Sequence, residues 1–198
     1  MLSYSYIHHA PFEQLLRWWD GIDPLPADFS EGGIDEVAYA LSKHPPEGVG
    51  VLKRFLEASD LARRRAALCF LAWPEVADEE VRAALLRAFY SEDRDLRYTA
   101  LWGYIDLNYF PLERAKLTTL LDADDQRMAA LAMVYLSHAF PEDSVKILRE
   151  ALGSPNPRMR EYACDEIGDR DIEELKSEMR MLLGDKDTRV VEAAASNL

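Results

Sequence analysis

Aromatic and acidic side chains recur at four-residue intervals in several stretches of this 198-residue chain. Two series stand out, one with two rings and a carboxylate and one with three carboxylates: Tyr98, Trp102 and Asp106, and Glu161, Asp165 and Asp169. On an α-helix this spacing places side chains on one face, about one turn apart. A ring face can hold an ammonium or guanidinium group, and a nearby carboxylate can form a charged hydrogen bond with it. If both stretches are helical, each offers a surface for a cationic ligand.

Both series lie inside a repeat whose units each start a helix at an Asx residue. Asn156 followed by Pro157 is a strong helix start, because Asn accepts from free N–H groups and Pro fits the first turn. Five such residues lie 33, 32, 31 and 31 positions apart: Asp60, Asp93, Asp125, Asn156 and Asp187. Large apolar residues stand eight and four positions before each and eleven after it, with Ala at the seventh. In the fifth unit these positions are Met179, Leu183, Ala194 and Leu198.

This pattern predicts helical pairs that stack on one another. A pair of this size cannot bury its own apolar stripe, and Ala lets a neighbouring helix approach closely. We expect an all-α fold, an α-solenoid of about five helical hairpins forming a single continuous domain over residues 46–198. The Arg residues four positions after the caps, Arg64, Arg97 and Arg160, are expected to pair with Asp residues of neighbouring caps.

The second helices resemble the short HEAT-like repeats of the phycobilisome-lyase type, which begin with Asp, a spacer, an apolar residue and Arg, followed by Ala. The matching residues are Asp93, Leu96, Arg97 and Ala100 in one unit, and Asn156, Met159, Arg160 and Ala163 in another. Three units depart from the pattern, with Arg63 in the apolar position and Ala129 and Val191 in the Arg position. The resemblance, over roughly 46–198, is therefore to the repeat class and not to one enzyme.

In HEAT-like solenoids the second helices line the concave surface. The resemblance thus implies that side chains opposite the core, nine positions after each cap and four to either side, form the floor of a groove. The candidate partner-binding residues on this row are Arg65, Trp73, Tyr98, Trp102, Asp106, His138, Glu161, Asp165 and Asp169. Cys69, Ala130 and Val134 lie on it too, and we expect the whole row to face solvent.

The formal net charge of −13 argues against nucleic acid and favours a basic protein partner, because phosphate binding depends on Lys and Arg. The leading hypothesis is a non-enzymatic scaffold or adaptor whose groove binds a basic protein segment; an inhibitor or immunity protein is a special case. HEAT-like DNA glycosylases place a Trp and an Asp one turn apart to stabilise a damaged, cationic base, and Trp102 with Asp106 has this spacing. A third alternative is a phycobilisome-lyase-like chaperone that attaches a bilin to Cys residues.

No other group of residues suggests catalysis, a metal or a cofactor, and we expect none of the three. Two Cys residues without metal-ligand spacing, and no apolar secretory segment, favour a reducing, cytoplasmic setting. No apolar run is long enough to span a membrane. Cys69 follows Arg65 by one turn, which favours its thiolate, whereas Cys164 is expected to be packed.

The two ends of the chain carry separate expectations. Residues 1–45 are predicted to form an N-terminal helical cap, with one helix starting at Pro11, an acidic loop over 20–36 and a helix over 34–43. In the last helix Val191 and Ala195 lie where a sixth unit would pack. We expect this edge to form a homodimer through the C-terminal repeat or to contact another chain.

Overall fold

The computed structural model describes residues 7, 9–25, 33–122 and 124–198. Part of the expected acidic loop, residues 26–32, lies outside this range. The chain divides into two compact units, Met1–Leu107 and Asn108–Leu198, which we call the N-terminal and C-terminal units and describe separately.

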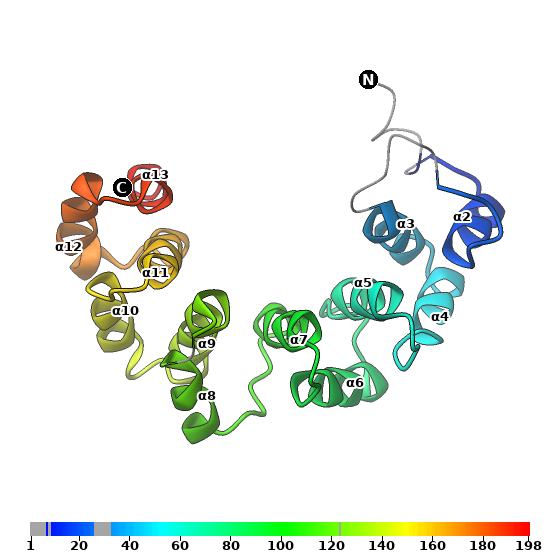
Figure 1. Cartoon of the computed structure of the whole chain (residues 1–198), viewed down its shortest axis with the longest axis horizontal. Helices are drawn as coiled ribbons and strands as arrows, with labels where there is room; N and C mark the ends of the chain where they lie inside the picture. The colour runs from blue at the N-terminus through cyan, green and yellow to red at the C-terminus, as the bar shows by residue number, and fades with distance from the viewer. Residues whose placement is uncertain (1–6, 8, 26–32, 123) are drawn as a thin grey trace. The chain divides into compact units, whose positions relative to one another are not determined.

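Over residues 9–25 and 33–107, the N-terminal unit consists of three pairs of helices. In order these are α2 (Phe12–Trp19), α3 (Gly33–Ser42), α4 (Glu47–Lys53), α5 (Leu61–Leu71), α6 (Glu79–Phe89) and α7 (Arg94–Asp106). Within this unit α5 packs against both α3 and α7, so that α3, α5 and α7 form one layer (Figure 1). The predicted N-terminal pair, α2 and α3, therefore places its second helix in the same stack as the second helices of the repeats.

The C-terminal unit continues the same alternation. Its elements are α8 (Arg114–Leu121), α9 (Gln126–Ala139), α10 (Ser144–Leu152), α11 (Pro157–Asp169), the short 3-10 helix η2 (Glu173–Leu175), α12 (Lys176–Met181), the 3-10 helix η3 (Leu182–Gly184) and α13 (Thr188–Ser196). Here α11 packs against both α9 and α13 (Figure 1). The described residues contain no strand, and the predicted all-α solenoid of helical hairpins is confirmed.

Every second helix of the repeats begins at its predicted Asx residue. The side chains of the five caps accept hydrogen bonds from backbone N–H groups two or three residues later: Asp60, Asp93, Asp125, Asn156 and Asp187. At Asp93, Oδ1 accepts from the N–H of Leu96 at 2.8 Å. These bonds satisfy donors that the first turn of a helix otherwise leaves unpaired.

The predicted core positions are buried in the first four units, except that Leu121 is half-buried. In the fifth unit Met179 and Ala194 are fully buried, but Leu183 and Leu198 are 45% and 40% exposed, so their predicted burial was wrong. Leu183 lies in η3, where the tighter 3-10 rotation moves a side chain off the α-helical stripe. Leu198 follows the end of α13 at Ser196 and no longer has helical geometry to direct it inward.

The arginines four positions after the caps stabilise the preceding turns. Arg97 donates from Nη1 to the carbonyl oxygens of Ser91 and Glu92, at 3.0 and 3.1 Å. Arg64 lies 3.5 Å from a carboxylate oxygen of Glu57. The expected pairing with Asp residues of neighbouring caps was therefore wrong for both, because their guanidinium groups contact carbonyl or carboxylate oxygens of the preceding turn instead.

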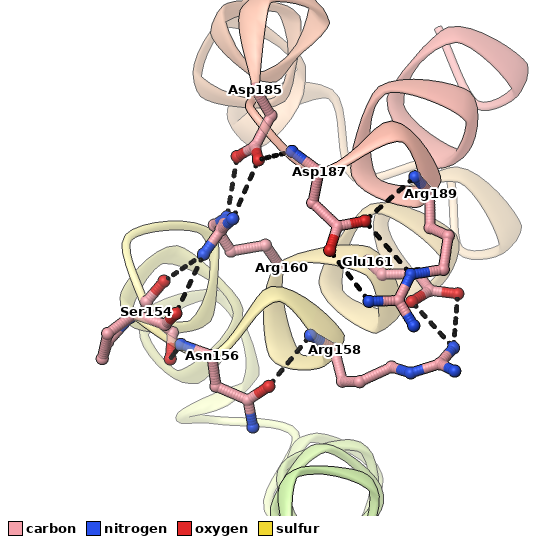
Figure 2. A network of polar contacts seen from close by, with 9 residues as sticks. Ser154, Asn156, Arg158, Arg160, Glu161, Asp185, Asp187 and Arg189 are labelled. Carbon is pink, nitrogen blue, oxygen red and sulfur yellow. Dashed lines mark hydrogen bonds and ion pairs between the residues drawn. The ribbon is translucent and has the colours of Figure 1, made fainter.

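Arg160 joins two consecutive repeats. Its Nη1 donates to the carbonyl oxygens of Ser154 and Pro155, at 2.7 and 3.3 Å, as Arg97 does in its own turn. Its Nε and Nη2 donate to the two carboxylate oxygens of Asp185, both at 2.8 Å (Figure 2). Asp185 also accepts from the N–H of the cap residue Asp187 at 2.8 Å, so the partner of Arg160 lies two residues before the cap.

We predict that Asp185→Asn destabilises the protein by about 3 kcal/mol at neutral pH, because it leaves a buried guanidinium without its counter-ion. Both side chains are only 8% exposed. The bond from Arg160 lowers the pKa of Asp185, so this stability is present above the usual pKa of Asp and is lost as the pH falls through the lowered value. Urea denaturation should show that the difference in unfolding free energy between Asp185→Asn and the wild type becomes smaller in acid. Glu142→Gln, at an exposed site, is the control, and equal midpoints for wild type and Asp185→Asn at pH 7 would refute the prediction.

Candidate functional site

Five of the predicted partner-binding residues lie on the α5 and α7 faces of the N-terminal unit, and α3 adds three residues beside them. We call this set the aromatic row: Asp35, Tyr39 and Lys43 from α3 and its end; Arg65, Cys69 and Trp73 from α5 and its end; and Tyr98, Trp102 and Asp106 from α7. The α3 residues were not predicted. Their own four-residue spacing was the available signal, and it was missed because no Asx residue directly precedes Gly33.

The rings of the aromatic row meet edge to face. Tyr98 and Trp102 have ring centroids 6.4 Å apart at 77°, and both side chains are half-buried. Next to Trp102, a Cβ atom at Gly103 would lie 2.8 Å from a methyl group of Leu85 and 3.0 Å from Ala72. The missing side chain thus lets α7 pack closely against its neighbours, which holds Trp102 at the boundary between core and solvent.

A second group of rings lies where α3 meets α5. Trp73 contacts Tyr39 and Phe70, with ring centroids 6.2 Å away in each case. The Lys43 ammonium lies over two of these rings, 4.5 Å from the centroid of Trp73 and 4.8 Å from that of Tyr39. This cation–π contact is an interaction of the kind that the row was predicted to offer to a ligand.

Two carboxylates influence the middle of the aromatic row. Asp35 Oδ2 lies 3.5 Å from Arg65 Nη2. Desolvation of the thiol by neighbouring groups, and then the charges of Asp35 and Asp106, raise the pKa of the exposed Cys69 against the opposing effect of Arg65. The expected thiolate at Cys69 was therefore wrong, and this residue is a thiol at neutral pH. Desolvation also raises the pKa of Asp106, which is exposed and forms no ion pair with any described residue.

The other four predicted residues lie in the C-terminal unit and form what we call the acidic row: His138, Glu161, Asp165 and Asp169. Two of them are already engaged. His138 Nε2 lies 2.7 Å from a carboxylate oxygen of Glu166. Both Glu161 carboxylate oxygens accept from Arg158 Nη1, at 3.0 to 3.1 Å (Figure 2). Asp165 and Asp169 are thus the carboxylates of the row that form no ion pair with another described residue.

Asp165 is held by an amide and not by a cation. It accepts from Asn197 Nδ2 at 3.1 Å, and a Cβ atom at Gly168 would lie 2.1 Å from Asn197 Oδ1, so only Gly allows this approach. Partial burial raises the pKa of Asp165, the Asn197 hydrogen bond opposes this, and the charges of Glu161, Asp169 and Glu166 raise it further. The fold therefore disfavours the ionised form of this side chain.

The middle of the predicted solvent-facing row differs from the expectation. Ala130 and Val134 are 0% and 1% exposed, so their assignment to the surface was wrong. The α9 sequence is apolar on nearly every side, and its described residues from Met128 to Ser137 are all buried. A helix without a polar face is buried all round, whatever its register.

Within the part of the chain that the structure describes, no cluster of His, Cys, Asp or Glu is arranged to hold a metal ion. No helix in that part has the length and hydropathy needed to cross a membrane.

Residues 114–198 match the family model of HEAT repeats. This chain is a HEAT-like repeat protein. The match begins with α8 and includes the acidic row, and the Asx-capped helix pairs of this HEAT-like protein extend through α4–α7 as well. HEAT repeats generally serve as protein-interaction scaffolds. No curated protein matches the chain.

We predict that Asp165→Asn raises the melting temperature at neutral pH by roughly 1–3 °C, on a scale where about 1 kcal/mol shifts a chain of this length by about 2–4 °C. Asn keeps the oxygen that accepts from Asn197 and removes the disfavoured charge. Because folding raises the pKa of Asp165, the cost is present above the raised value and disappears below the usual pKa of Asp. The gain should therefore vanish in acid.

Asp106→Asn should act in the same direction with a smaller effect, because Asp106 is more exposed. Glu142→Gln, the exposed control, should leave the melting temperature unchanged. Calorimetric scans between neutral and acidic pH measure both variants, and a lower melting temperature for Asp165→Asn at pH 7 would show that this carboxylate is structural.

Proposed function

We propose that this protein is a non-enzymatic scaffold that binds basic segments of a partner protein on its aromatic and acidic rows. The observation that carries the proposal is that each row holds a carboxylate, the exposed Asp106 or the half-buried Asp165, with a raised pKa and no cationic partner among the described residues. A Lys or Arg side chain from another protein would supply the missing charge. Both carboxylates would then be stabilised only in the complex.

In the aromatic row, a cationic side chain can be bound by two groups together. Trp102 lies one turn before Asp106 on α7, and Tyr98 lies one turn before Trp102. A guanidinium or ammonium group on the Trp102 face would be within reach of the Asp106 carboxylate. Planar Arg suits this arrangement because it stacks and donates at the same time.

In the acidic row, the charges available to a partner are those of Asp165 and Asp169. Glu161 and Glu166 already have Arg158 and His138 as partners, so they contribute negative potential rather than open acceptors. The net charge of −13 would also accelerate the approach of a basic partner. An inhibitor or immunity protein that covers a basic toxin would use the same interactions.

The glycosylase alternative would use the same Trp102 and Asp106. It also needs free cations for the DNA backbone. On the aromatic row Arg65 is close to Asp35, and Lys43 lies over Tyr39 and Trp73. This arrangement favours protein binding over DNA binding. For the phycobilisome-lyase-like chaperone, the resemblance of the repeats is the sole support, and no contact of the described residues favours it.

The homodimer through the C-terminal repeat stays a prediction. Met181 and Leu183 are 77% and 45% exposed in this repeat, and Ala195 is exposed on α13. Exposed apolar surface of this kind favours association. We expect light scattering over a concentration series to show a dimer that Val191→Asp dissociates. A protein that remains monomeric at every concentration would rule the dimer out.

For the partner-binding rows, we predict that a labelled peptide rich in Lys and Arg binds the protein at physiological ionic strength, whereas its Glu-rich counterpart does not. Trp102→Ala should weaken binding by about 2 kcal/mol or more, roughly 30-fold, as expected for an aromatic anchor. Asp165→Asn should weaken it while raising the melting temperature. Fluorescence anisotropy measures the affinity, and circular dichroism melts show whether each variant is folded.

The matched control is Glu142→Gln, which removes the same charge as Asp165→Asn away from both rows. Equal weakening by the two variants would mean that net charge alone attracts the peptide, and would reject the rows as the site. Binding of duplex DNA at the same salt concentration, with release of an alkylated base that Asp106→Asn abolishes, would instead support the glycosylase.

A further inference from the structure

Tyr39, Phe70 and Trp73 form a cluster of three rings between α3 and α5. The ring centroids lie 5.7 Å apart for Tyr39 and Phe70, and 6.2 Å apart for each pair that includes Trp73. All three pairs meet edge to face, at 62° to 72°, and each side chain is half-buried. Edge-to-face packing leaves ring faces, which carry the negative part of the quadrupole, directed away from the ring contacts.

This cluster already holds an ammonium group. Lys43 directly follows the last residue of α3, Ser42, and its Nζ lies 4.8 Å from the ring centroid of Tyr39 and 4.5 Å from that of Trp73. The chain has 36 acidic and 23 basic side chains, so carboxylates are abundant. Even so, none of the described residues forms an ion pair with Lys43. The rings therefore determine where this cation lies.

We propose that the Tyr39–Phe70–Trp73 cluster is a binding site for a lysine ammonium group of the partner's basic segment, and that Lys43 is an internal competitor for it. The inference rests on the proposed function and assigns it a specific pocket and ligand group. Aromatic clusters that hold an alkylammonium group on their ring faces are an established means of recognition. Here the contact made by Lys43 shows that the cluster has the chemistry to do so.

Exchange of Lys43 for a partner's lysine requires little rearrangement. Lys43 is exposed, and an exposed cation–π contact changes an equilibrium by only about two- to fivefold. The cluster is also part of the aromatic row, because α3, α5 and α7 stack within one unit and both Tyr39 and Trp73 belong to the row. A basic segment that engages Trp102 and Asp106 can therefore extend to the cluster along the same helices.

The first test uses tetramethylammonium chloride, with sodium chloride at equal ionic strength as the reference. Lys43→Met removes the ammonium group from the rings of Tyr39 and Trp73, and we expect the salt to shift the indole N–H resonance of Trp73 in a saturable way. Lys146→Met removes the same charge from an exposed site on α10 and keeps the competitor, so its response should be about two- to fivefold weaker. Adding Tyr39→Leu to Lys43→Met, or Phe70→Leu should that variant not fold, keeps the Trp73 indole N–H as the probe and should abolish the response.

The second test uses the peptide rich in Lys and Arg. Lys43→Met should bind it about two- to fivefold more tightly than Lys146→Met does, since one competing contact is gone. In the wild-type protein the ε-methylene resonances of Lys43, shifted upfield by the two rings, should move towards solvent-exposed values as the peptide is added. Resonances that stay in place while the peptide binds would overturn the proposal.

The two tests separate failure of this site from failure of the proposed function. Equal peptide affinities for Lys43→Met and Lys146→Met, with no response to tetramethylammonium, would overturn the cluster as a site and leave partner binding by the rows intact. If tetramethylammonium binds to Lys43→Met but the peptide binds to neither variant, the cluster is a cation site and the proposed function is wrong.

Discussion

The hydrogen bonds from Asp and Asn side chains to the first turn of each second helix determine the geometry of the repeats. Each cap defines where its helix begins, so the Ala seven positions later is buried in all five units, and the apolar residue eleven positions later is buried in the first four. The residue nine positions later points away from the core except on α9, where Val134 is buried. The ends of the helices repeat as well. Asn108 and Asp171, each fifteen positions after a cap, have positive φ angles of 46° and 50°, which Asn and Asp adopt more readily than most residues.

Stacking of the second helices follows from these fixed starts, and single residues adjust it. Gly103 allows the close approach of Leu85 and Ala72 in the N-terminal unit, and Gly168 allows that of Asn197 in the C-terminal unit. Arg63, which departs from the repeat pattern, donates from Nε to the carbonyl oxygen of Trp19 at 2.5 Å. It thereby satisfies the C-terminal end of α2 and connects the N-terminal helix pair to the first repeat. The residue that departs from the repeat pattern thus stabilises the contact between the N-terminal helix pair and the first repeat.

Charged side chains that form ion pairs stabilise the fold, whereas the unpaired carboxylates of the two rows destabilise it. Arg160 and Asp185 neutralise each other inside the structure, and Arg158 neutralises Glu161. Asp106 and Asp165 lack such partners, and the fold disfavours their charged forms. Charges retained at a cost to stability are common at binding sites, because the partner supplies the compensating group. This contrast, rather than the total number of acids, is what supports a binding role for the rows.

The sequence alone determined the features that depend on neighbouring residues along the chain. The caps, the period, the helical pairs and the buried Ala positions could all be predicted, because capping and helical periodicity act within a few residues. The four-residue spacing also placed Tyr98, Trp102 and Asp106 on one face of α7. Only the tertiary structure decided which atoms of other elements meet these side chains: the carboxylate of Asp185 beside Arg160, the Trp73 ring beneath Lys43, the surroundings that raise the pKa of Cys69, and the burial of Val134. Each depends on contacts between residues far apart in sequence, and helical periodicity carries no information about those distances.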